Sequence, residues 1–214
     1  MEQVANVIGA SGLVGQQIVG QLLNHPDFKK VRIFVRRKSG ITHPKLVEHL
    51  IDFDKPELWK DLVKGDVLFS TLGTTIKVAK TKENQYRVDF IYQYEFAKVA
   101  AENGISTYVL VSSMGASSKS SVFYSRIKGE LEDAVSKLNF QKTIIFRPSI
   151  LDGNRQEKRA GEKIGLVVSR FLTRFILKNY KPTPADILAD KMILLSLDQT
   201  SGLRMIEGAD IFSV

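Results

Sequence analysis

Apolar residues occur in short, nearly continuous runs that alternate with longer segments of helical periodicity. The runs predict buried strands at residues 4–8, 31–35, 46–51, 67–70, 108–112 and 143–146. The segments between them predict helices at residues 12–23, 56–63, 86–103 and 124–138. Strands without a polar face that alternate with helices are typical of a parallel sheet covered on both sides. The pattern therefore predicts an α/β protein with a doubly wound parallel sheet.

The chain beyond residue 150 is less regular. It predicts an amphipathic helix at residues 164–177, a further helix at 185–197 and a last strand at 204–207. This tail is too short to form an independent substrate domain. We therefore expect one domain over residues 1–214, in which about residues 150–200 form a small C-terminal cap on the substrate side, at the carboxyl edge of the sheet.

Composition removes several classes of site. The chain has 214 residues, of which 43% are hydrophobic and 25% charged, as in ordinary soluble globular proteins. It has no cysteine, which excludes disulfides, iron–sulfur clusters and thiol nucleophiles, and its three histidines all lie in the first quarter, so no metal site is expected. The net charge of +8 favours an anionic partner such as a phosphorylated cofactor, nucleic acid or an anionic membrane.

The sequence predicts neither a membrane span nor a targeting segment. The longest apolar candidate, residues 164–177, is interrupted by Arg170 and Arg174. The first three residues lack the basic and apolar features of a signal peptide, and the first strand follows at once. We therefore expect a cytoplasmic protein.

A glycine pattern follows the first strand. Gly9, Gly12 and Gly15 lie between that strand and the first helix. Glycines at this place let the backbone turn tightly and approach a pyrophosphate, whose charge the helix N-terminus stabilises. A lone glycine triplet is weak evidence, but the strand, turn and helix required by the motif are all predicted here. The pattern predicts a Rossmann-type dinucleotide site; the alternative is a tight turn without a ligand.

Basic residues follow the second strand. NAD-preferring proteins have an acidic residue here for the ribose hydroxyls, whereas this chain has Arg36, Arg37 and Lys38. A guanidinium can bind a 2′-phosphate through two hydrogen bonds, so the pattern indicates NADP(H); the alternative is a solvated basic turn. Two more strand ends complete the expected cofactor path, with adenine beside the pair Asp52 and Phe53 and the inner ribose beside the pair Leu72 and Gly73.

Residues suited to carbonyl chemistry follow the fifth strand. Ser112 and Ser113 lie at its end, and Tyr124 and Lys128 lie four residues apart, on one face of the predicted helix. A nearby ammonium stabilises a phenolate, so Tyr124 could exchange a proton with a carbonyl or alcohol oxygen that a serine holds. We choose Ser113, although the sequence does not separate it from Ser112. The alternative for the Tyr–Lys pair is an amphipathic helix with a surface lysine.

These motifs resemble the short-chain dehydrogenase/reductase superfamily in its atypical branch. More closely, the chain resembles the Tat-interacting oxidoreductase family, NADPH-binding proteins related to nucleoside-diphosphate-sugar epimerases and NmrA-like regulators. The segments that carry this resemblance are residues 70–75, 87–89, 112–116, 120–124, 128–130, 146–148 and 155–157. The resemblance covers roughly residues 4–175 and is weak over the last forty residues.

The resemblance implies roles for individual residues. Ser11, Gly12, Leu13 and Val14 would bind the pyrophosphate, and Arg36 with Arg37 the 2′-phosphate. Tyr124 would be the proton donor, with Lys128 as its partner, and both would contact the cofactor. Two further cofactor contacts would come from residues after position 150, with Leu151 near the nicotinamide and Arg159 reaching from the cap.

Two functional hypotheses follow. The first is an NADPH-dependent oxidoreductase, or a related epimerase-like enzyme, that acts on a carbonyl or alcohol substrate which the sequence does not identify. The second is an NADPH-sensing regulatory module whose basic tail binds a partner protein. Nucleic-acid binding through residues 155–181 is weaker, because the aromatic residues there recur at helical spacing and favour a core position. The chain could be a monomer or a homodimer.

Overall fold

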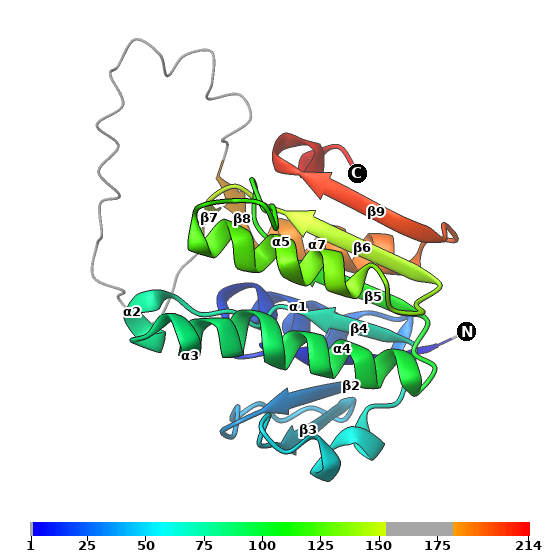
Figure 1. The fold of residues 1–214 in the computed structure, drawn as a ribbon. Coiled ribbons are helices and arrows are strands. Elements are labelled where there is room, and N and C mark those ends of the chain that lie inside the picture. The colour runs from blue at the N-terminus through cyan, green and yellow to red at the C-terminus, as the bar shows by residue number, and fades with distance from the viewer. Residues whose placement is uncertain (1, 153–181) are drawn as a thin grey trace.

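A seven-stranded sheet forms the centre of the computed structural model, which describes residues 2–152 and 182–214 (Figure 1). The order is β3-β2-β1-β4-β5-β6-β9, and every pairing is parallel. The order reverses between β1 and β4, which is the point at which doubly wound sheets bind ligands. The strands are β1 (Gln3–Ile8), β2 (Phe28–Val35), β3 (Leu46–Leu50), β4 (Val67–Ser70), β5 (Thr107–Val111), β6 (Lys142–Arg147) and β9 (Gly202–Glu207).

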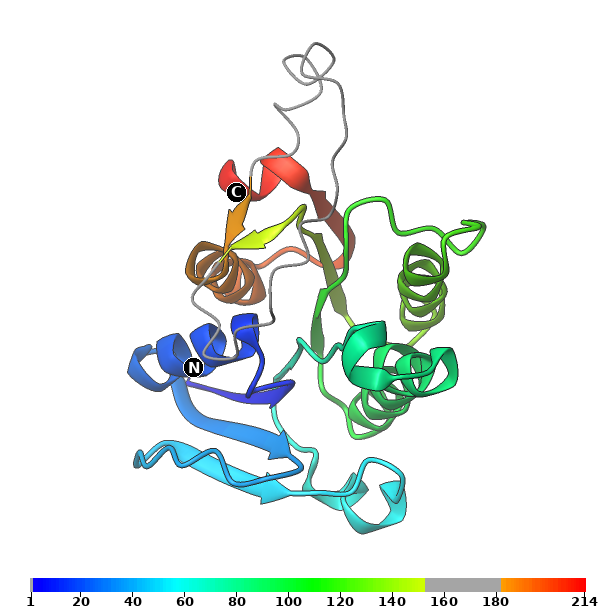
Figure 2. The same ribbon diagram turned by 90° about the vertical axis from the view of Figure 1, so that its left-hand side faces the viewer.

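Helices cover both faces of this sheet (Figure 2). One face carries α1 (Leu13–Asn24) and α7 (Ala185–Leu197), which pack against each other. The other carries α5 (Phe123–Val135) and a continuous helical rod made of α3 (Lys82–Tyr86), the π-turn η3 (Arg87–Ile91) and α4 (Tyr92–Glu102). No helix among the described residues is long and apolar enough to cross a bilayer.

Alternate residues of each strand supply the two layers of the core. Val109 and Ile144 pack towards α1 and α7, whereas Leu110 and Ile145 pack towards α4 and α5. All four are fully buried. The near-continuous apolar runs in the sequence are explained by this double cover, since neither face of a central strand meets water. The predicted parallel α/β sheet is therefore confirmed.

Short elements complete the described chain. The segment predicted as a helix at residues 56–63 forms two 3-10 turns instead, because it is too short for an α-helix to gain from repeated hydrogen bonds. The single turn α2 after β4 was not predicted. These elements are η1 (Pro56–Leu58), η2 (Lys60–Leu62), α2 (Ile76–Ala79), β7 (Leu151–Asp152), β8 (Thr183–Pro184) and η4 (Gly208–Phe212).

The tail joins the sheet more closely than a cap would. Leu188 and Met192 bury α7 against the same sheet face as α1, and β9 pairs with β6 as the outermost strand. The cap expected at about residues 150–200 stays a prediction, because residues 153–181 lie outside the described residues, together with the helix predicted at 164–177 and with Arg159.

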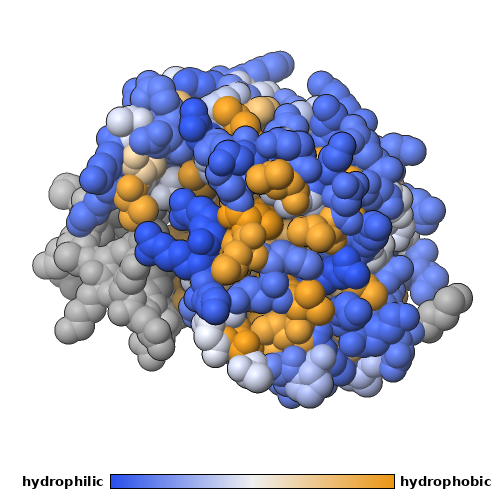
Figure 3. Space-filling model, turned by 90° about the horizontal axis from the view of Figure 1, so that it is seen from below, coloured by the Kyte–Doolittle hydropathy of each residue, from blue (hydrophilic) through white to orange (hydrophobic). Residues whose placement is uncertain are grey.

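The opposite edge of the sheet is formed by β3, which pairs with β2 alone. Seen from this side, apolar side chains lie among charged ones on the surface (Figure 3). Leu50 at the end of β3 and Leu58 in η1 are among the exposed apolar residues, at 54% and 69%. Exposed apolar residues also occur on α7 and β9, so their presence does not single out this face.

Candidate active site

The glycine turn after β1 has no room for a side chain at Gly9 or Gly15. Gly9 has φ +81°, and a Cβ there would lie 2.5 Å from the backbone nitrogen of Leu72. A Cβ on Gly15 would lie 2.1 Å from the carbonyl oxygen of Gly9. The Gly12 N–H donates to that same oxygen at 2.8 Å. The turn therefore folds directly onto the backbone that follows β4, so the ends of β1 and β4 meet at the switch point.

The turn leads into a helix N-terminus suited to an anion. Helix α1 begins at Leu13, carries no acidic residue in its first turn and has no side-chain cap. Its first N–H groups and the helix dipole therefore favour a negatively charged group. Ser11 is exposed at this end, whereas the Val14 side chain is buried in the core. Val14 could thus offer an anion only its backbone N–H.

Two free guanidinium groups follow β2. Arg36 and Arg37 are exposed, and neither forms an ion pair or hydrogen bond with another described residue. Arg32, further back on β2, differs because it donates to the Leu62 carbonyl oxygen at 2.8 Å. The arginines at the carboxyl end of the strand therefore remain available for an anionic ligand.

The pair expected beside adenine is divided between surface and core. Asp52 is exposed, with its carboxylate 3.5 Å from the Lys55 ammonium. The Phe53 side chain is buried and stacks on Tyr92, with ring centroids 5.3 Å apart. The Phe53 ring therefore does not line the rim, and only its backbone could contact a cofactor.

Tyr124 and Lys128 share one face at the start of α5. The Lys128 nitrogen Nζ lies 6.0 Å from the centroid of the Tyr124 ring. Tyr124 is 40% exposed at the carboxyl edge, whereas Lys128 is 3% exposed. A Cβ on Gly73 would lie 3.8 Å from Nζ of Lys128. The segment from Leu72 to Gly73 thus touches the glycine turn at one end and the lysine at the other.

The two serines lie on a loop that β6 and β9 hold. The Ser112 N–H donates to the Phe146 carbonyl at 2.7 Å, and the Gly115 N–H donates to the Glu207 carboxylate at 3.2 Å. The Ser112 hydroxyl is buried without a partner among the described residues. The Ser113 hydroxyl donates weakly to the Met114 carbonyl at 3.4 Å. Both serines are therefore near the edge, and the choice between them stays a prediction.

Asp89 is a site residue that the sequence analysis did not predict. Its carboxylate oxygen Oδ1 lies 3.2 Å from Nζ of Lys128, and both side chains are nearly inaccessible, at 1% and 4% exposure. Its other oxygen accepts the Thr74 N–H at 3.0 Å. Burial disfavours the Lys128 ammonium, but the negative charges of the Asp89 carboxylate and of the Tyr124 phenolate outweigh that effect and raise the pKa of Lys128.

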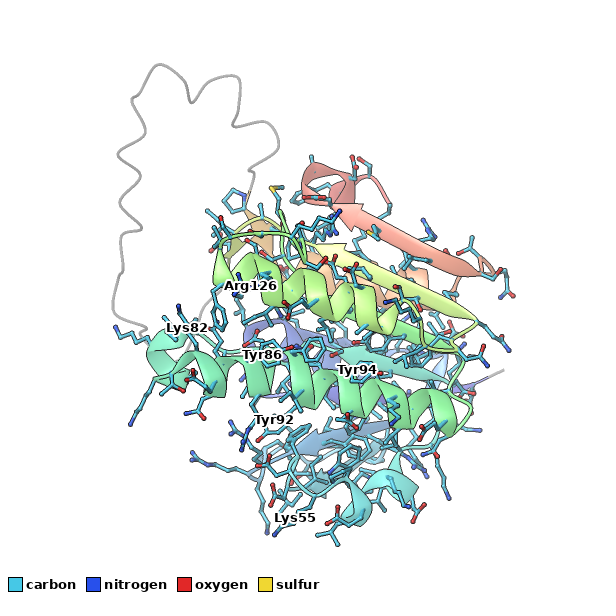
Figure 4. The ribbon with its side chains drawn as sticks, viewed as in Figure 1. Lys55, Lys82, Tyr86, Tyr92, Tyr94 and Arg126 are labelled. Carbon is cyan, nitrogen blue, oxygen red and sulfur yellow. The ribbon has the colours of Figure 1, made fainter. Side chains whose placement is uncertain are left out.

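Contacts across α3 and α5 hold the residue before Tyr124. The Lys82 nitrogen Nζ lies 5.4 Å from the Phe123 ring centroid, and the Arg126 guanidinium carbon lies 5.8 Å from it. Figure 4 shows Lys82 and Arg126 approaching from the two helices. Such cation–π contacts contribute about 0.5–1 kcal/mol each at exposed sites. Of these two contacts, that of Lys82 joins α3 to the first turn of α5, whereas that of Arg126 lies within α5.

The last expected contacts lie further along the edge. Leu151 lies in β7, which pairs with β8, and its half-buried side chain packs against the core. Arg159 lies outside the described residues. The structure therefore brings together the ends of β1, β4 and β5 and the start of α5, while the contribution of the tail stays a prediction.

Comparisons with known proteins agree with this arrangement. A family model described as NAD(P)H-binding matches residues 9–172. The mitochondrial protein fmp52-1 of Aspergillus terreus is 32% identical over 212 residues, which cover 94% of this chain and 88% of that protein. The mitochondrial protein FMP52 of Candida albicans is 38% identical over 156 residues, which cover 71% and 68%. These relatives are not named Tat-interacting oxidoreductases.

Solved structures agree on the fold. MoeE5 in complex with UDP-glucuronic acid and NAD superposes with a TM-score of 0.73 at 16% identity, covering 95% of this chain and 76% of that one. A uronate dehydrogenase superposes with a TM-score of 0.71 at 17% identity, covering 98% and 75%. The fold is therefore shared with NAD-binding epimerases and dehydrogenases.

The relatives correct one expectation from the sequence. The cytoplasmic location is wrong, because the fungal relatives at 31–38% identity are named as mitochondrial proteins. The expectation depended on the features of a secretory signal peptide, and location can depend on signals that lack that pattern. Family model and relatives together establish that the chain belongs to the NAD(P)H-binding family and is a relative of the fungal FMP52 proteins.

Proposed function

We propose that this protein is an NADPH-dependent oxidoreductase of the short-chain dehydrogenase/reductase type that transfers hydride to or from a carbonyl or alcohol. The contact path at the carboxyl edge is the main support. It runs from the glycine turn, through Leu72 and Gly73, to Lys128 and Tyr124. A dinucleotide bound on the glycine turn would thus extend towards a phenol and an ammonium.

The residues at this edge fit such a cofactor. The turn has no room for a side chain at Gly9 or Gly15, and the first turn of α1 has no acidic residue, so a pyrophosphate could approach the backbone closely. Arg36 and Arg37 would hold a 2′-phosphate, and Leu72 with Gly73 would line the ribose. When bound, the cofactor would supply or accept the hydride.

The chain's own residues would manage the proton. In the direction of reduction, the Tyr124 phenol would donate its proton to the carbonyl oxygen of the substrate. The Lys128 ammonium would stabilise the resulting phenolate through its positive charge. The Ser113 hydroxyl, or that of Ser112, would donate a hydrogen bond to the same oxygen and stabilise the charge developing there.

Removing only the phenolic hydroxyl tests this mechanism. Purified protein is mixed with NADPH and a panel of carbonyl compounds, and oxidation of NADPH is followed in single turnovers. We expect Tyr124→Phe to lower the rate by about 10²–10⁴-fold, the usual contribution of a general acid. Tyr94→Phe is the matched control, because Tyr94 lies on α4 in a stack with Phe90. Equal rates for Tyr124→Phe and the parent would refute the mechanism.

The arginine pair tests the choice of cofactor. We expect Arg36→Ala/Arg37→Ala to weaken NADPH binding by roughly 10–100-fold, since charge-assisted hydrogen bonds contribute about 1.5–3 kcal/mol. NADH affinity should change little. The control Lys29→Ala/Lys30→Ala removes the same charge from exposed positions on the same strand, β2, far from its carboxyl end. Calorimetric titration that finds no preference of the parent for NADPH would contradict the assignment.

Two broader proposals accompany this function. The names of the fungal relatives lead us to propose a mitochondrial location. We also propose, from the motifs given above, that the chain is allied to the Tat-interacting oxidoreductases. A regulatory module that binds a protein partner through its basic tail depends on residues 155–181, so no contact of the described residues favours it over catalysis.

A further inference from the structure

We infer that Asp89 is a positioning residue of this site, whose buried carboxylate fixes the Lys128 ammonium between Tyr124 and the Gly73 turn and keeps it charged. The inference rests on the proposed function for its catalytic consequence. Its structural part rests on the ion pair alone, with Oδ1 of Asp89 3.2 Å from Nζ of Lys128.

The burial of this pair makes the carboxylate necessary to the ammonium. A charged group that is nearly inaccessible to water loses its hydration and is retained only if an opposite charge or hydrogen bonds replace it. Within residues 2–152 and 182–214, the titratable groups that raise the pKa of Lys128 are Asp89 from η3 and Tyr124 and Glu132 from its own helix. Glu132 is itself paired with Arg147 from β6. Asp89 is therefore the carboxylate available to balance Lys128.

The same carboxylate also fixes the backbone that would line the ribose. Its Oδ2 accepts the Thr74 N–H at 3.0 Å, and a Cβ on Gly73 would lie 3.3 Å from its Oδ1. Asp89 thus connects the turn after β4 to Lys128 on α5. Its own position is set by the π-turn η3, whose carbonyl at Asp89 accepts the Gln93 side-chain N–H at 2.8 Å. π-turns inside helices are frequent at functional sites.

A positioning role and a purely structural role predict different pH dependence. The raised pKa of Lys128 means that the ammonium persists as the pH increases. Asp89→Asn keeps an oxygen that can accept the Thr74 N–H but removes the charge, so burial would then favour neutral lysine. The variant should lose NADPH-dependent turnover at a lower pH than the parent, by about one pH unit or more. A structural role would lower the rate equally at every pH.

The titration of Lys128 tests the inference independently of turnover. Full-length protein with ¹³Cε-labelled lysine is titrated by NMR, with the Lys128 signal assigned from its loss in Lys128→Arg. We expect a midpoint above that of ordinary lysine in the parent and a midpoint lower by at least about one unit in Asp89→Asn. Asp133→Asn is the control, because it removes an equal charge from an exposed position on α5.

Each result decides one proposal. Equal Lys128 midpoints in the parent and Asp89→Asn would overturn the inference, whatever the enzyme turns over. If Asp89→Asn does not fold, a parental midpoint at or below the ordinary lysine value would overturn it, and a higher midpoint would support it. The Lys128 midpoint could be lower in Asp89→Asn while the parent oxidises NADPH with none of the carbonyl compounds in the panel. That combination would support the ion-pair role of Asp89 and count against the proposed reaction.

Discussion

The tightness of the glycine turn can be measured with two alanine substitutions on one helix. Gly15 and Gly20 both lie in α1. A Cβ on Gly20 would meet nothing within 4 Å, whereas a Cβ on Gly15 would lie 2.1 Å from the Gly9 carbonyl oxygen. Both substitutions replace glycine by alanine inside a helix, so both gain about 0.5–1 kcal/mol from helix propensity. The difference between them therefore isolates the steric cost of the turn.

The magnitude follows from that contact. A carbon and a carbonyl oxygen normally approach no closer than about 3.3 Å, so the Gly9 carbonyl would have to move by about 1 Å. Its carbonyl carbon and the Thr71 hydroxyl oxygen, both 2.8 Å from the added Cβ, leave little room for that movement. Overpacking of this kind costs about 1–3 kcal/mol. Displacement of the turn would also move the N–H groups proposed for the pyrophosphate, which should weaken NADPH binding about tenfold or more.

Thermal unfolding by circular dichroism and calorimetric titration with NADPH test the pair. For a chain of this length, 1 kcal/mol corresponds to roughly 2–4 °C. Gly20→Ala should raise the midpoint by about 1–4 °C and leave NADPH affinity unchanged, whereas Gly15→Ala should lower both. If Gly15→Ala were as stable as Gly20→Ala and bound NADPH like the parent, the turn would not be as tight as described, and its role in cofactor binding would be refuted.

Two further predictions concern stability. Lys80 follows α2 with φ +70°, a backbone conformation that glycine adopts more easily than lysine. Lys80→Gly should therefore stabilise the protein by roughly 0.5–1 kcal/mol, whereas Lys77→Gly inside α2 should not. Urea unfolding of the two variants tests this. Burial alone would raise the pKa of Asp198, but hydrogen bonds from Thr200 and Lys142 lower it to about 2 from the ordinary 3.8. The ionised Asp198 therefore contributes about 1–2 kcal/mol to the free energy of unfolding above pH 3.8, and this contribution is lost as the pH falls towards 2. The difference in free energy of unfolding between the parent and Asp198→Asn should close over that interval. A constant difference would contradict the pairing.

Signals within a few residues of a strand end were readable from the sequence. The glycine turn, Arg36 and Arg37 each follow an apolar run that is long enough to identify the strand before it. The pairing of Tyr124 with Lys128 needed only helical spacing. Their meeting at one edge followed from the rule that parallel strands end on the same side. The positions of these residues at strand ends and on one helix face needed only local geometry plus one general rule of topology, whereas their roles in binding and catalysis stay predictions.

Other features depended on weak or distant signals. The one-turn helix α2 contains β-branched Ile76 and Val78 and shows no periodicity. The start of α3 had a readable signal, since Thr81 accepts the Asn84 N–H at 3.1 Å as an N-cap. The sequence predicts adenine beside Asp52 and Phe53 but does not predict where the Phe53 ring lies, because the aromatic residues that hold this ring in the core come from other segments.

Asp89 could not be predicted from apolar periodicity, because the stripe to which it belongs is polar at this point. The buried stripe along the rod of α3, η3 and α4 recurs at four-residue spacing, but it is polar at Gln85, Asp89 and Gln93 and apolar only from Phe96 onwards. Polar residues survive in such a stripe where partners replace water, and here the Ser70 hydroxyl donates to Gln93 at 2.7 Å. Where the buried positions stay on one side of a helix but change from apolar to polar residues, that part of the helix therefore borders a site and not the apolar core. Applied to this chain, that criterion selects Gln85, Asp89 and Gln93, of which only Asp89 carries a charge. The pairing of Asp89 with Lys128 still requires the packing of η3 on α5.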